Sequence, residues 1–388
     1  MKTLVRITTV PISLDKLIEG QMRFMSTYFK VMGVSSNKEE LQKVGEKQNV
    51  ETFTVNMTRK ITPLQDLKAV YTFYKYLKQT KPDIVHSHTP KAGIVGMLAS
   101  YFAKVPVRLH TVAGLPLVES KGLKKNILKV VETITYKCAT KVYPNSYGLK
   151  QIILDEKLAK KNQLKVIANG SSNGINLSHF NRNQLNESDL NQLKNSLNIA
   201  ENDFVYVFVG RLVGDKGINE LIASFKKLSG IKKDIKLLLV GTLETELDPL
   251  KPETLQEIKT NKNIISVGFQ QDVRSYFAIS NLLVFPSYRE GFPNVVMQAG
   301  ALELPSIVSN INGCNEIITE NKNGYIVPVK DEKALYFSML KCLENQAETL
   351  QLAQNARAVL LEKYDQKVIW EALLSEYNDH LKDIKSDL

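Results

Sequence analysis

Two cationic residues beside a turn form a possible binding site for a sugar diphosphate. Arg211 and Lys216 follow the apolar run FVYVFVG, which ends at Gly210, and the turn between them opens a helical pattern. Two fixed cations at a strand end can neutralise a diphosphate and stabilise it as it leaves with growing charge. A solvated turn with ordinary surface cations is the alternative. The buried strand before the pair favours the functional interpretation.

An acid in a second turn complements these cations. Glu290 lies in EGFPN, where Pro293 suits the first turn of a helix. The amides that follow would be free to point at an anion or a hydroxyl; they belong to Asn294, Val295 and Val296. Gln298, one helical turn further, would reach the same side as the helix N-terminus. An acid near a helix N-terminus can also be merely stabilising, so that alternative stays open. Together the two turns indicate a nucleotide-sugar enzyme.

The elements that must position these residues alternate along the chain. Short β-rich runs and helical patterns follow one another, which predicts βαβ units and parallel sheets. We expect strands at 3–10, 31–35, 51–55, 83–87, 106–111, 140–144, 164–168, 203–210, 236–241, 264–268, 282–287, 305–309 and 324–329. We expect helices at 64–79, 90–103, 122–138, 146–154, 217–228, 272–279, 294–302 and 331–345, and a helical tail at 347–384. The fold class is therefore α/β, with ligands at the carboxyl ends of the strands.

The length of 388 residues exceeds what one hydrophobic core usually supports. The glycine- and asparagine-rich segment ANGSSNGINLSHF breaks the alternation and places the interdomain connection near 175–182. We expect a first Rossmann-like domain at 1–178 and a second at 179–365. A C-terminal helix at 366–388 is expected to pack back on the first domain.

Composition narrows the classes of protein. No run approaches the ~20 apolar residues of a spanning helix, and MKTLVRITTV is typical of a first strand rather than a signal peptide. Three separated cysteines, Cys138, Cys314 and Cys342, favour a reducing cytosol. Residues 1–180 carry a net charge of +16 and residues 181–388 one of −5. The basic half suggests an anionic partner, although surface lysines with no such role are the alternative.

The motifs resemble a family of enzymes. GRLVGDKG, LLLVG, VGFQQDV, EGFPNVVMQ and INGCNEII with NGYIVP resemble the retaining glycosyltransferases of family 4, which have the GT-B fold. Segments of the first half, VPISLDKLIEGQ, VHSHTPKAGIVG, HTVAGLP and YPNSYGL, resemble bacterial transferases of capsule and O-antigen assembly. The resemblance implies two facing Rossmann-like domains with a cleft between them. It implies transfer of a sugar, with retention, from a UDP-sugar to a glycan or an undecaprenyl-diphosphate-linked glycan.

The resemblance also assigns roles. Arg211 and Lys216 match the diphosphate-binding pair, and Glu290 matches the acid that holds donor-sugar hydroxyls. Amides from Phe292 to Val296 would hold the sugar and phosphates. Gln298 stands where the family usually has a ribose-binding acid; an amide can also accept from one hydroxyl and donate to another.

In the first half, His110 matches the histidine near the transferred sugar. Gly20 matches the glycine region near the donor phosphate, although many relatives have two glycines there. His86 and His88 would line the acceptor site, but His86 could equally be a packed strand residue. Lys91 is a weaker candidate for an acceptor phosphate.

No D-x-D triplet occurs, so we expect neither a metal nor any other cofactor, and we expect no nucleic-acid partner. Residues 121–141 combine six lysines with an apolar stripe, and most of that stripe is expected to pack on the sheet. We expect the basic face to contact anionic lipid, and the enzyme to work on the cytoplasmic side of the membrane. The alternatives are a nucleotide-sugar 2-epimerase on the same scaffold, for which no set of acids can be assembled, and a non-catalytic nucleotide-sugar-binding subunit.

Overall fold

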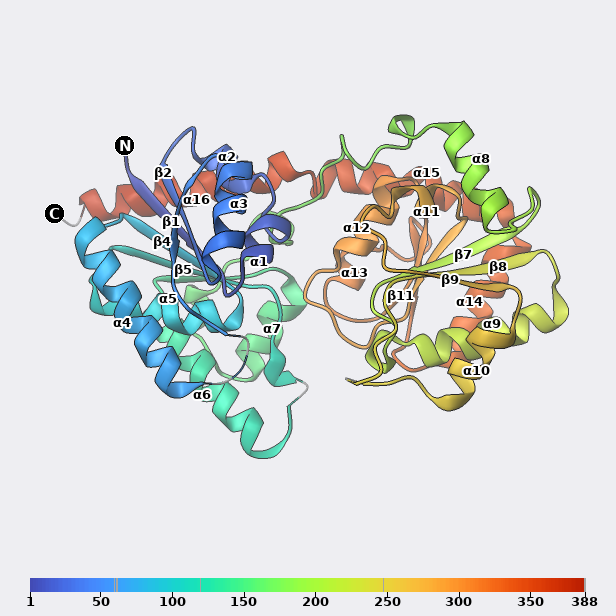
Figure 1. Cartoon of the computed structure of the whole chain (residues 1–388), viewed down its shortest axis with the longest axis horizontal. Coiled ribbons are helices and arrows are strands. Elements are labelled where there is room, and N and C mark those ends of the chain that lie inside the picture. The colour runs from blue at the N-terminus through green and yellow to red at the C-terminus, as the bar shows by residue number, and fades with distance from the viewer. Residues whose placement is uncertain (59, 61, 119, 247, 387–388) are drawn as a thin grey trace. The chain divides into compact units, whose positions relative to one another are not determined.

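The computed structural model describes residues 1–58, 60, 62–118, 120–246 and 248–386. The chain forms two compact units, each built around its own parallel sheet (Figure 1). Unit 1 comprises Met1–Gly174 and Gln366–Leu388, and unit 2 comprises Ile175–Asp365. The chain therefore leaves unit 1 slightly before the expected boundary at 178.

The sheet of unit 1 has six strands in the order β3-β2-β1-β4-β5-β6, all parallel. The strands are β1 Thr3–Ile7, β2 Lys30–Ser35, β3 Glu51–Thr54, β4 Ile84–His88, β5 Val107–Val112 and β6 Lys141–Pro144. The α-helices are α1 Pro11–Lys16, α2 Gln21–Met25, α3 Lys38–Gln48, α4 Pro63–Thr80, α5 Pro90–Phe102, α6 Gly122–Cys138, α7 Tyr147–Asp155 and α16 Gln366–Ser386. Short 3₁₀ turns lie at Pro116–Val118 and Lys161–Gln163.

Unit 2 repeats this topology with the strand order β12-β11-β10-β7-β8-β9. Its strands are β7 Phe204–Val209, β8 Ile235–Val240, β9 Ile264–Gly268, β10 Leu282–Phe285, β11 Ser306–Ser309 and β12 Gly324–Val327. Its α-helices are α8 Glu187–Ser196, α9 Ile218–Ile231, α10 Pro252–Thr260, α11 Arg274–Ala278, α12 Asn294–Ala301, α13 Cys314–Ile317, α14 Glu332–Glu344 and α15 Gln346–Lys363. Further 3₁₀ turns lie at Arg182–Gln184 and Gly214–Lys216.

Both units have the doubly wound strand order of Rossmann-like domains. In unit 2 the chain steps outward from β7 to β9, then returns to pair β10 with the other side of β7. Strands buried on both faces are continuously apolar, and β7 with the sequence FVYVFV is almost entirely buried. The point where the strand order reverses, between β7 and β10, is where such sheets bind ligands at their carboxyl ends. In unit 1 the equivalent point lies between β1 and β4.

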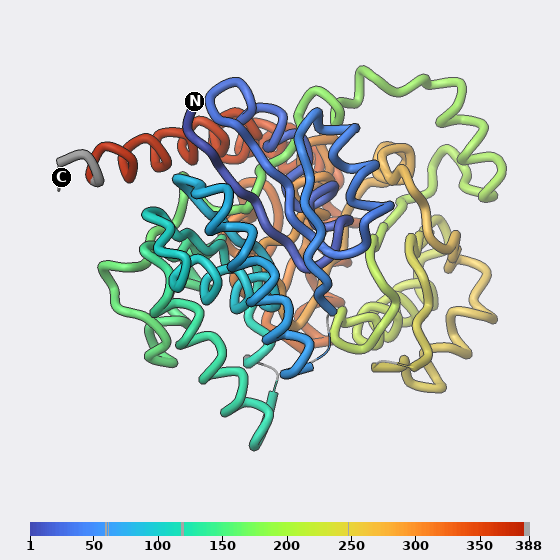
Figure 2. Tube along the Cα trace, turned by 60° about the vertical axis from the view of Figure 1, so that its left-hand side comes forward, coloured from blue at the N-terminus to red at the C-terminus, as the bar shows by residue number. Residues whose placement is uncertain are grey.

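The C-terminal helix α16 packs on unit 1, whose other residues end at Gly174 in the sequence. It runs beside α2 and the sheet in two views of the chain (Figures 1 and 2). The ring of Trp370 lies 5.3 Å from that of Phe24, and the ring of Tyr377 lies 5.8 Å from that of Phe29. The aromatic side chains of α16 thus complete the second core of unit 1.

Some expectations from the sequence are wrong. Residues 164–168 form no strand; Leu164 makes a single bridge to Val142. The helical tail is confirmed, and it consists of α15 and of α16, which begins at the expected residue 366. Within the described part of the chain, no helix combines the length and apolar content of a membrane span.

Candidate active site

Unit 2 brings the two predicted turns together at the carboxyl ends of its central strands. Lys216, at the end of the turn after β7, forms an ion pair with Glu290, in the turn after β10. Only 18% of the lysine side chain and 16% of the glutamate side chain are exposed. Gly217 allows this approach, because its φ of +71° suits glycine and a Cβ there would lie 2.2 Å from the carbonyl oxygen of Pro286.

Further side chains fix Glu290 in place. The hydroxyl of Ser287 donates a hydrogen bond of 2.9 Å to the same carboxylate oxygen, Oε1. The amide Nδ2 of Asn312, which follows β11, donates to the backbone carbonyls of Glu290 and, at 3.2 Å, of Gly291. The ammonium of Lys216 also lies 5.6 Å from the centroid of the Phe285 ring. Ser287 and Asn312 were not predicted as site residues, although Asn312 lies in the motif INGCNEII and Ser287 lies three residues before EGFPNVVMQ.

Arg211 takes a different partner. Its Nη1 donates to Glu244 Oε2 over 2.6 Å, and its side chain is 54% exposed. It follows Gly210, the first residue after β7. An exposed ion pair of this kind contributes only about 0–1 kcal/mol, so an incoming diphosphate could take the guanidinium from Glu244 at little cost.

The helix after Glu290 differs in detail from the expectation. Pro293 is the N-cap of α12 rather than part of its first turn. The amide of Val296 donates to the carbonyl of Pro293 over 3.2 Å, so it is not free for a ligand as predicted. The amides of Asn294 and Val295 have no acceptor among the described residues. Phe292 is buried, with its ring 5.3 Å from that of Tyr364.

Gln298 lies in α12, one turn after Asn294, and is partly buried. Unit 2 thus gathers Lys216, Glu290 and the start of α12 at one edge of its sheet, with Arg211 directly after β7. A cation beside a carboxylate, next to free helix amides, can bind a phosphate and a sugar hydroxyl at adjacent positions.

Unit 1 holds the predicted histidines in its interior. His110, in β5, is 2% exposed, and its Nδ1 lies 2.8 Å from the hydroxyl of Ser87. Its ring packs against the start of α5, where a Cβ on Gly93 would lie 2.6 Å from His110 Cε1. Burial lowers the pKa of His110 to about 4, so the imidazole is neutral at physiological pH.

His86 and His88 are both buried but differ in their hydrogen bonds. Both rings are buried, and burial holds both pKa values well below the usual range. The nitrogens of His86 lie 2.6 Å from the Tyr377 hydroxyl and 2.8 Å from the Thr111 hydroxyl, so both are occupied. His86 therefore has the packed strand position that the sequence left open.

His88 keeps one nitrogen without a partner. Arg6 Nη2 lies 2.8 Å from His88 Nε2, and because a guanidinium only donates, Nε2 accepts and Nδ1 carries the proton. Nδ1 is buried and has no partner among the described residues.

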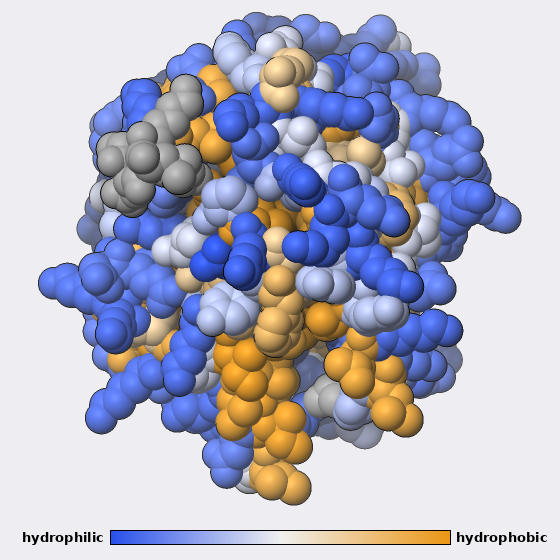
Figure 3. Space-filling view, turned by 90° about the vertical axis from the view of Figure 1, so that its left-hand side faces the viewer, coloured by the Kyte–Doolittle hydropathy of each residue, from blue (hydrophilic) through white to orange (hydrophobic). Residues whose placement is uncertain are grey.

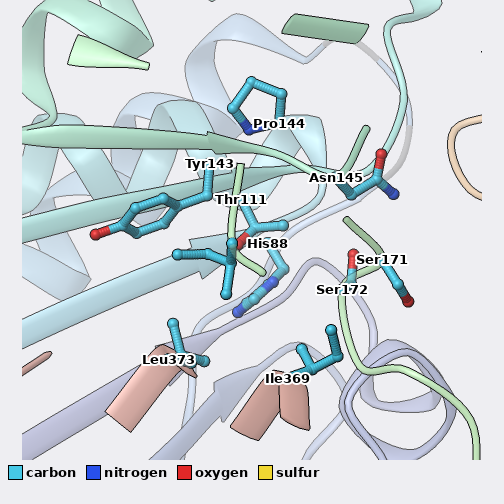
Figure 4. A pocket seen from close by; sticks show the side chains of 10 residues that line it. His88, Thr111, Tyr143, Pro144, Asn145, Ser171, Ser172, Ile369 and Leu373 are labelled. Carbon is cyan, nitrogen blue, oxygen red and sulfur yellow. The ribbon is translucent and has the colours of Figure 1, made fainter. Parts of the chain in front are cut away.

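A small pocket adjoins this nitrogen at the carboxyl ends of β4, β5 and β6 (Figure 4). Its lining includes two further buried polar atoms without described partners, Asn145 Oδ1 and Ser172 Oγ. Ile369 and Leu373 of α16 supply apolar lining. The residues around the pocket thus include an imidazole, an amide and a hydroxyl, groups that can form hydrogen bonds with a hydroxyl group or a water molecule.

Two other predicted residues of unit 1 have structural partners. Gly20 precedes α2 with a φ of +75°, and a Cβ there would lie 2.9 Å from the Trp370 ring. Close packing of α16 thus explains this glycine without a ligand. Lys91 forms an ion pair with Asp66, and its side chain is 11% exposed, so its charge is already matched.

Comparison with known proteins gives matches to both units. The model of the family "Glycosyl transferases group 1" matches residues 189–359, and that of the "Glycosyl transferase 4-like domain" matches residues 35–170. The capsular polysaccharide biosynthesis glycosyltransferase CapM of Staphylococcus aureus is 36% identical over 369 residues, covering 95% of this chain and 94% of CapM. The UDP-Gal:alpha-D-GlcNAc-diphosphoundecaprenol alpha-1,3-galactosyltransferase of Escherichia coli is 28% identical, covering 79% of this chain and 77% of that enzyme.

Solved structures share the fold. A glycosyltransferase from Rickettsia africae superposes with a TM-score of 0.82 at 19% identity, covering 98% of this chain and 99% of its own. HepE from Anabaena, solved in complex with UDP, superposes with a TM-score of 0.79 at 20% identity, covering 98% of this chain and all of its own. At these identities the likeness shows the fold alone.

Proposed function

Because the chain belongs to the group 1 glycosyltransferases, with the GT-B fold, we propose that it transfers a sugar, with retention of anomeric configuration, from a UDP-sugar. The proposed acceptor is a glycan carried on a lipid diphosphate, and the proposed process is synthesis of a bacterial cell-surface polysaccharide. The relatives from S. aureus and E. coli, named for capsule synthesis and for a diphosphoundecaprenol acceptor, support this choice.

The observation that carries the proposal is the pairing of Lys216 with Glu290 beside the start of α12. The ammonium is placed to meet the donor diphosphate, while the carboxylate accepts hydrogen bonds from the sugar that the diphosphate carries. Arg211 would leave Glu244 to take a second phosphate oxygen. The amides of Asn294 and Val295 and the side chain of Gln298 would complete the donor site.

The cations would act mainly on the leaving group. As the bond from the sugar to UDP breaks, negative charge grows on the departing phosphate, and Lys216 and Arg211 stabilise it. The acceptor hydroxyl would attack from the face that UDP leaves, and its proton would pass to the departing phosphate. The bond from the acceptor oxygen to the sugar forms as the bond to UDP breaks. In this scheme no protein nucleophile and no metal ion is needed.

On the acceptor side we propose His88 rather than His86. The free Nδ1–H of His88 could donate to a hydroxyl in the pocket of Figure 4, and Asn145 could accept from it. His110 keeps its proposed place near the transferred sugar and would act there as a neutral imidazole. Work on a lipid-linked acceptor implies peripheral association with the inner face of the cytoplasmic membrane.

The test is incubation with a panel of nucleotide sugars, each with and without a lipid-diphosphate glycan, followed by assay of free nucleotide and of product linkage. Acceptor-dependent release of UDP with a retained anomeric centre is expected. Formation of a C2 epimer of the donor would support the 2-epimerase alternative. Binding of the panel without any turnover would support a non-catalytic subunit.

A further inference from the structure

The surface of unit 1 carries apolar side chains that no other described residue covers. Helices α4, α5 and α6 lie side by side (Figure 1). Leu64 of α4 is 86% exposed and Leu123 of α6 is 76% exposed. The other exposed apolar residues of these helices are Leu67, Tyr71, Tyr101, Phe102, Ile127, Val130 and Ile134. We call the outward surface of these three helices the outer helix face.

Of the five apolar residues that predicted a stripe on α6, Leu123, Ile127 and Ile134 are exposed, whereas Leu128 and Val131 are partly buried and Leu128 packs against the core. The expectation that most of this stripe packs on the sheet is therefore wrong, and Val130 joins its exposed part. Leu123, Ile127, Val130 and Ile134 recur at helical spacing and are all exposed. The buried side of α6 is made instead by Glu132, Thr135, Tyr136 and Cys138. Figure 3 shows hydrophobic residues gathered toward the lower edge of this side of the molecule, the region where α6 lies in Figure 1.

The charges on the same helices are almost all positive. Together α4, α5 and α6 contain eight lysines and two acids. Neither acid adds an unpaired exposed charge, because Asp66 is 23% exposed and pairs with Lys91, and Glu132 is 4% exposed. Lys125 and Lys129 pair with Glu156 of the segment after α7, at 2.9 Å and 2.7 Å.

The remaining lysines are open to solvent, and they border the apolar residues. On α6 these are Lys124 and Lys137, and on α4 they are Lys68, Lys75 and Lys78. The ammonium of Lys75 lies 4.7 Å from the ring centroid of Tyr71. The outer helix face therefore combines exposed apolar side chains with lysines and offers no exposed acid on its helices.

We propose that the outer helix face docks on an anionic lipid bilayer. Its aliphatic side chains, with Leu64 and Leu123 the most exposed, would enter the boundary between headgroups and acyl chains. The lysines around them would meet the phosphate groups of the lipids, since long basic side chains reach the headgroup level while their stems cover apolar surface. This surface deepens the proposed function, because it names the part of the enzyme that meets the membrane holding the acceptor.

Charge complementarity decides between a bilayer and a protein partner. Lysine is depleted in protein–protein interfaces, and a protein partner would have to bury several of these ammonium groups. A bilayer leaves them at its wet, anionic surface, where each contributes attraction. The apolar contribution resists salt, so binding is expected to weaken but persist at high salt, rather than to be released as a purely electrostatic contact would be.

The experiment is cosedimentation with vesicles of phosphatidylglycerol and phosphatidylcholine, at low and high salt, using the whole chain. Leu123→Glu with Ile127→Glu should lower the vesicle partition coefficient by about tenfold or more at both salt concentrations. Lys124→Gln with Lys137→Gln should weaken binding about tenfold at low salt and much less at high salt. The matched control is Ile231→Glu with Leu350→Glu, two similarly exposed apolar residues of unit 2, which should bind vesicles like the wild type.

UDP binding by calorimetry separates this proposal from the proposed function. The Leu123/Ile127 variant should bind UDP as the wild type does. Absence of UDP binding and transfer in a wild type that binds vesicles would reject the proposed function and leave the docking surface standing. Three results would overturn the docking surface: a wild type that ignores anionic vesicles at low salt, equal binding by the Leu123/Ile127 variant, or a solution dimer that this variant dissociates. The last result would assign the outer helix face to a second copy of the chain.

Discussion

Replacing Lys216 by alanine tests the donor site most directly, because the side chain has separable effects on catalysis and on stability. The ammonium faces Glu290, and both side chains are largely buried. If it stabilises the departing phosphate, its loss raises the transition-state barrier by ~3 kcal/mol, which is about a hundredfold in kcat. The loss should appear in kcat more than in KM, since the charge develops as UDP leaves.

The same substitution leaves a partly buried carboxylate with one fewer partner. Glu290 keeps the Ser287 hydroxyl, at 2.9 Å, but no longer faces a cation. The stability lost when a partly buried ion pair is broken lies between the loss for an exposed pair and the loss for a fully buried pair. We therefore expect Lys216→Ala to lower the unfolding free energy by about 1–2 kcal/mol. For a domain of this size that lowers Tm by roughly 2–4 °C per kcal/mol. Adding Glu290→Gln should restore most of the stability but none of the activity.

The measurements are steady-state UDP release and thermal unfolding of the two single variants and the double variant. Lys226→Ala is the control for loss of a lysine from an ion pair, because Lys226 pairs with Glu257, at 2.8 Å, between α9 and α10, although its side chain is 66% exposed. It should keep full activity. A Lys216→Ala enzyme with a normal kcat, or one whose whole defect is a raised KM, would refute the assignment of this cation to the leaving group.

Three further predictions follow from the same site and from the buried histidines. Glu290→Gln should depress transfer strongly, whereas Gln298→Glu should be tolerated and should tighten UDP binding; a Gln298→Glu variant that no longer binds UDP in calorimetry would contradict the ribose assignment. Transfer should survive EDTA, because Lys216 and Arg211 supply the positive charge; complete loss that manganese or magnesium restores would assign that charge to a metal ion. Burial lowers the pKa of His110 from 6.5 in the unfolded chain to about 4 in the folded protein. Between these two pH values the unfolded chain binds more protons than the folded protein. The contribution of His110 to stability is therefore full above pH 6.5 and is lost as the pH falls toward 4. His110→Gln should therefore remove a pH dependence of the unfolding free energy worth about 3 kcal/mol between pH 6.5 and 4. The effect is measured as the difference between the variant and the wild type, because Glu132, with a pKa raised to about 7, contributes the opposite slope in both proteins. Equal slopes of stability against pH in the two proteins would contradict the neutral, buried state of His110.

Most of the fold follows from local pattern. Continuous apolar runs such as FVYVFV predict strands buried on both faces, and their alternation with helical patterns predicts parallel sheets. The expected strand at 164–168 is wrong although β6 lies at the edge of its sheet, because only Leu164 pairs with that edge, through Val142. Six helices were not among those expected: α1, α2, α3, α8, α10 and α13. Three of them, α1, α2 and α13, have only four to six residues, too few to show a helical period.

The sequence by itself was enough to predict which residues would form the donor site. Arg211, Lys216, Glu290 and the start of α12 were identified from turn chemistry and from resemblance, because each motif is contiguous in the chain. The contacts that a motif makes depend on which other segments the fold places beside it. The pairing of Lys216 with Glu290 joins residues 74 positions apart, and it depends on β7 and β10 being neighbours in the sheet.

Only the tertiary structure decided the state of the other candidates. His86 forms a hydrogen bond with Tyr377, 291 positions away on α16. Arg6 contacts Nε2 of His88 and so leaves the proton on Nδ1, which has no partner among the described residues. Helix α6 illustrates the same limit of the sequence. Periodicity shows that a helix has an apolar side, but the neighbours that the fold brings to the helix decide whether that side is covered. In α6 the neighbours cover the side that holds Glu132 and Tyr136, and the stripe that begins at Leu123 is left to the solvent.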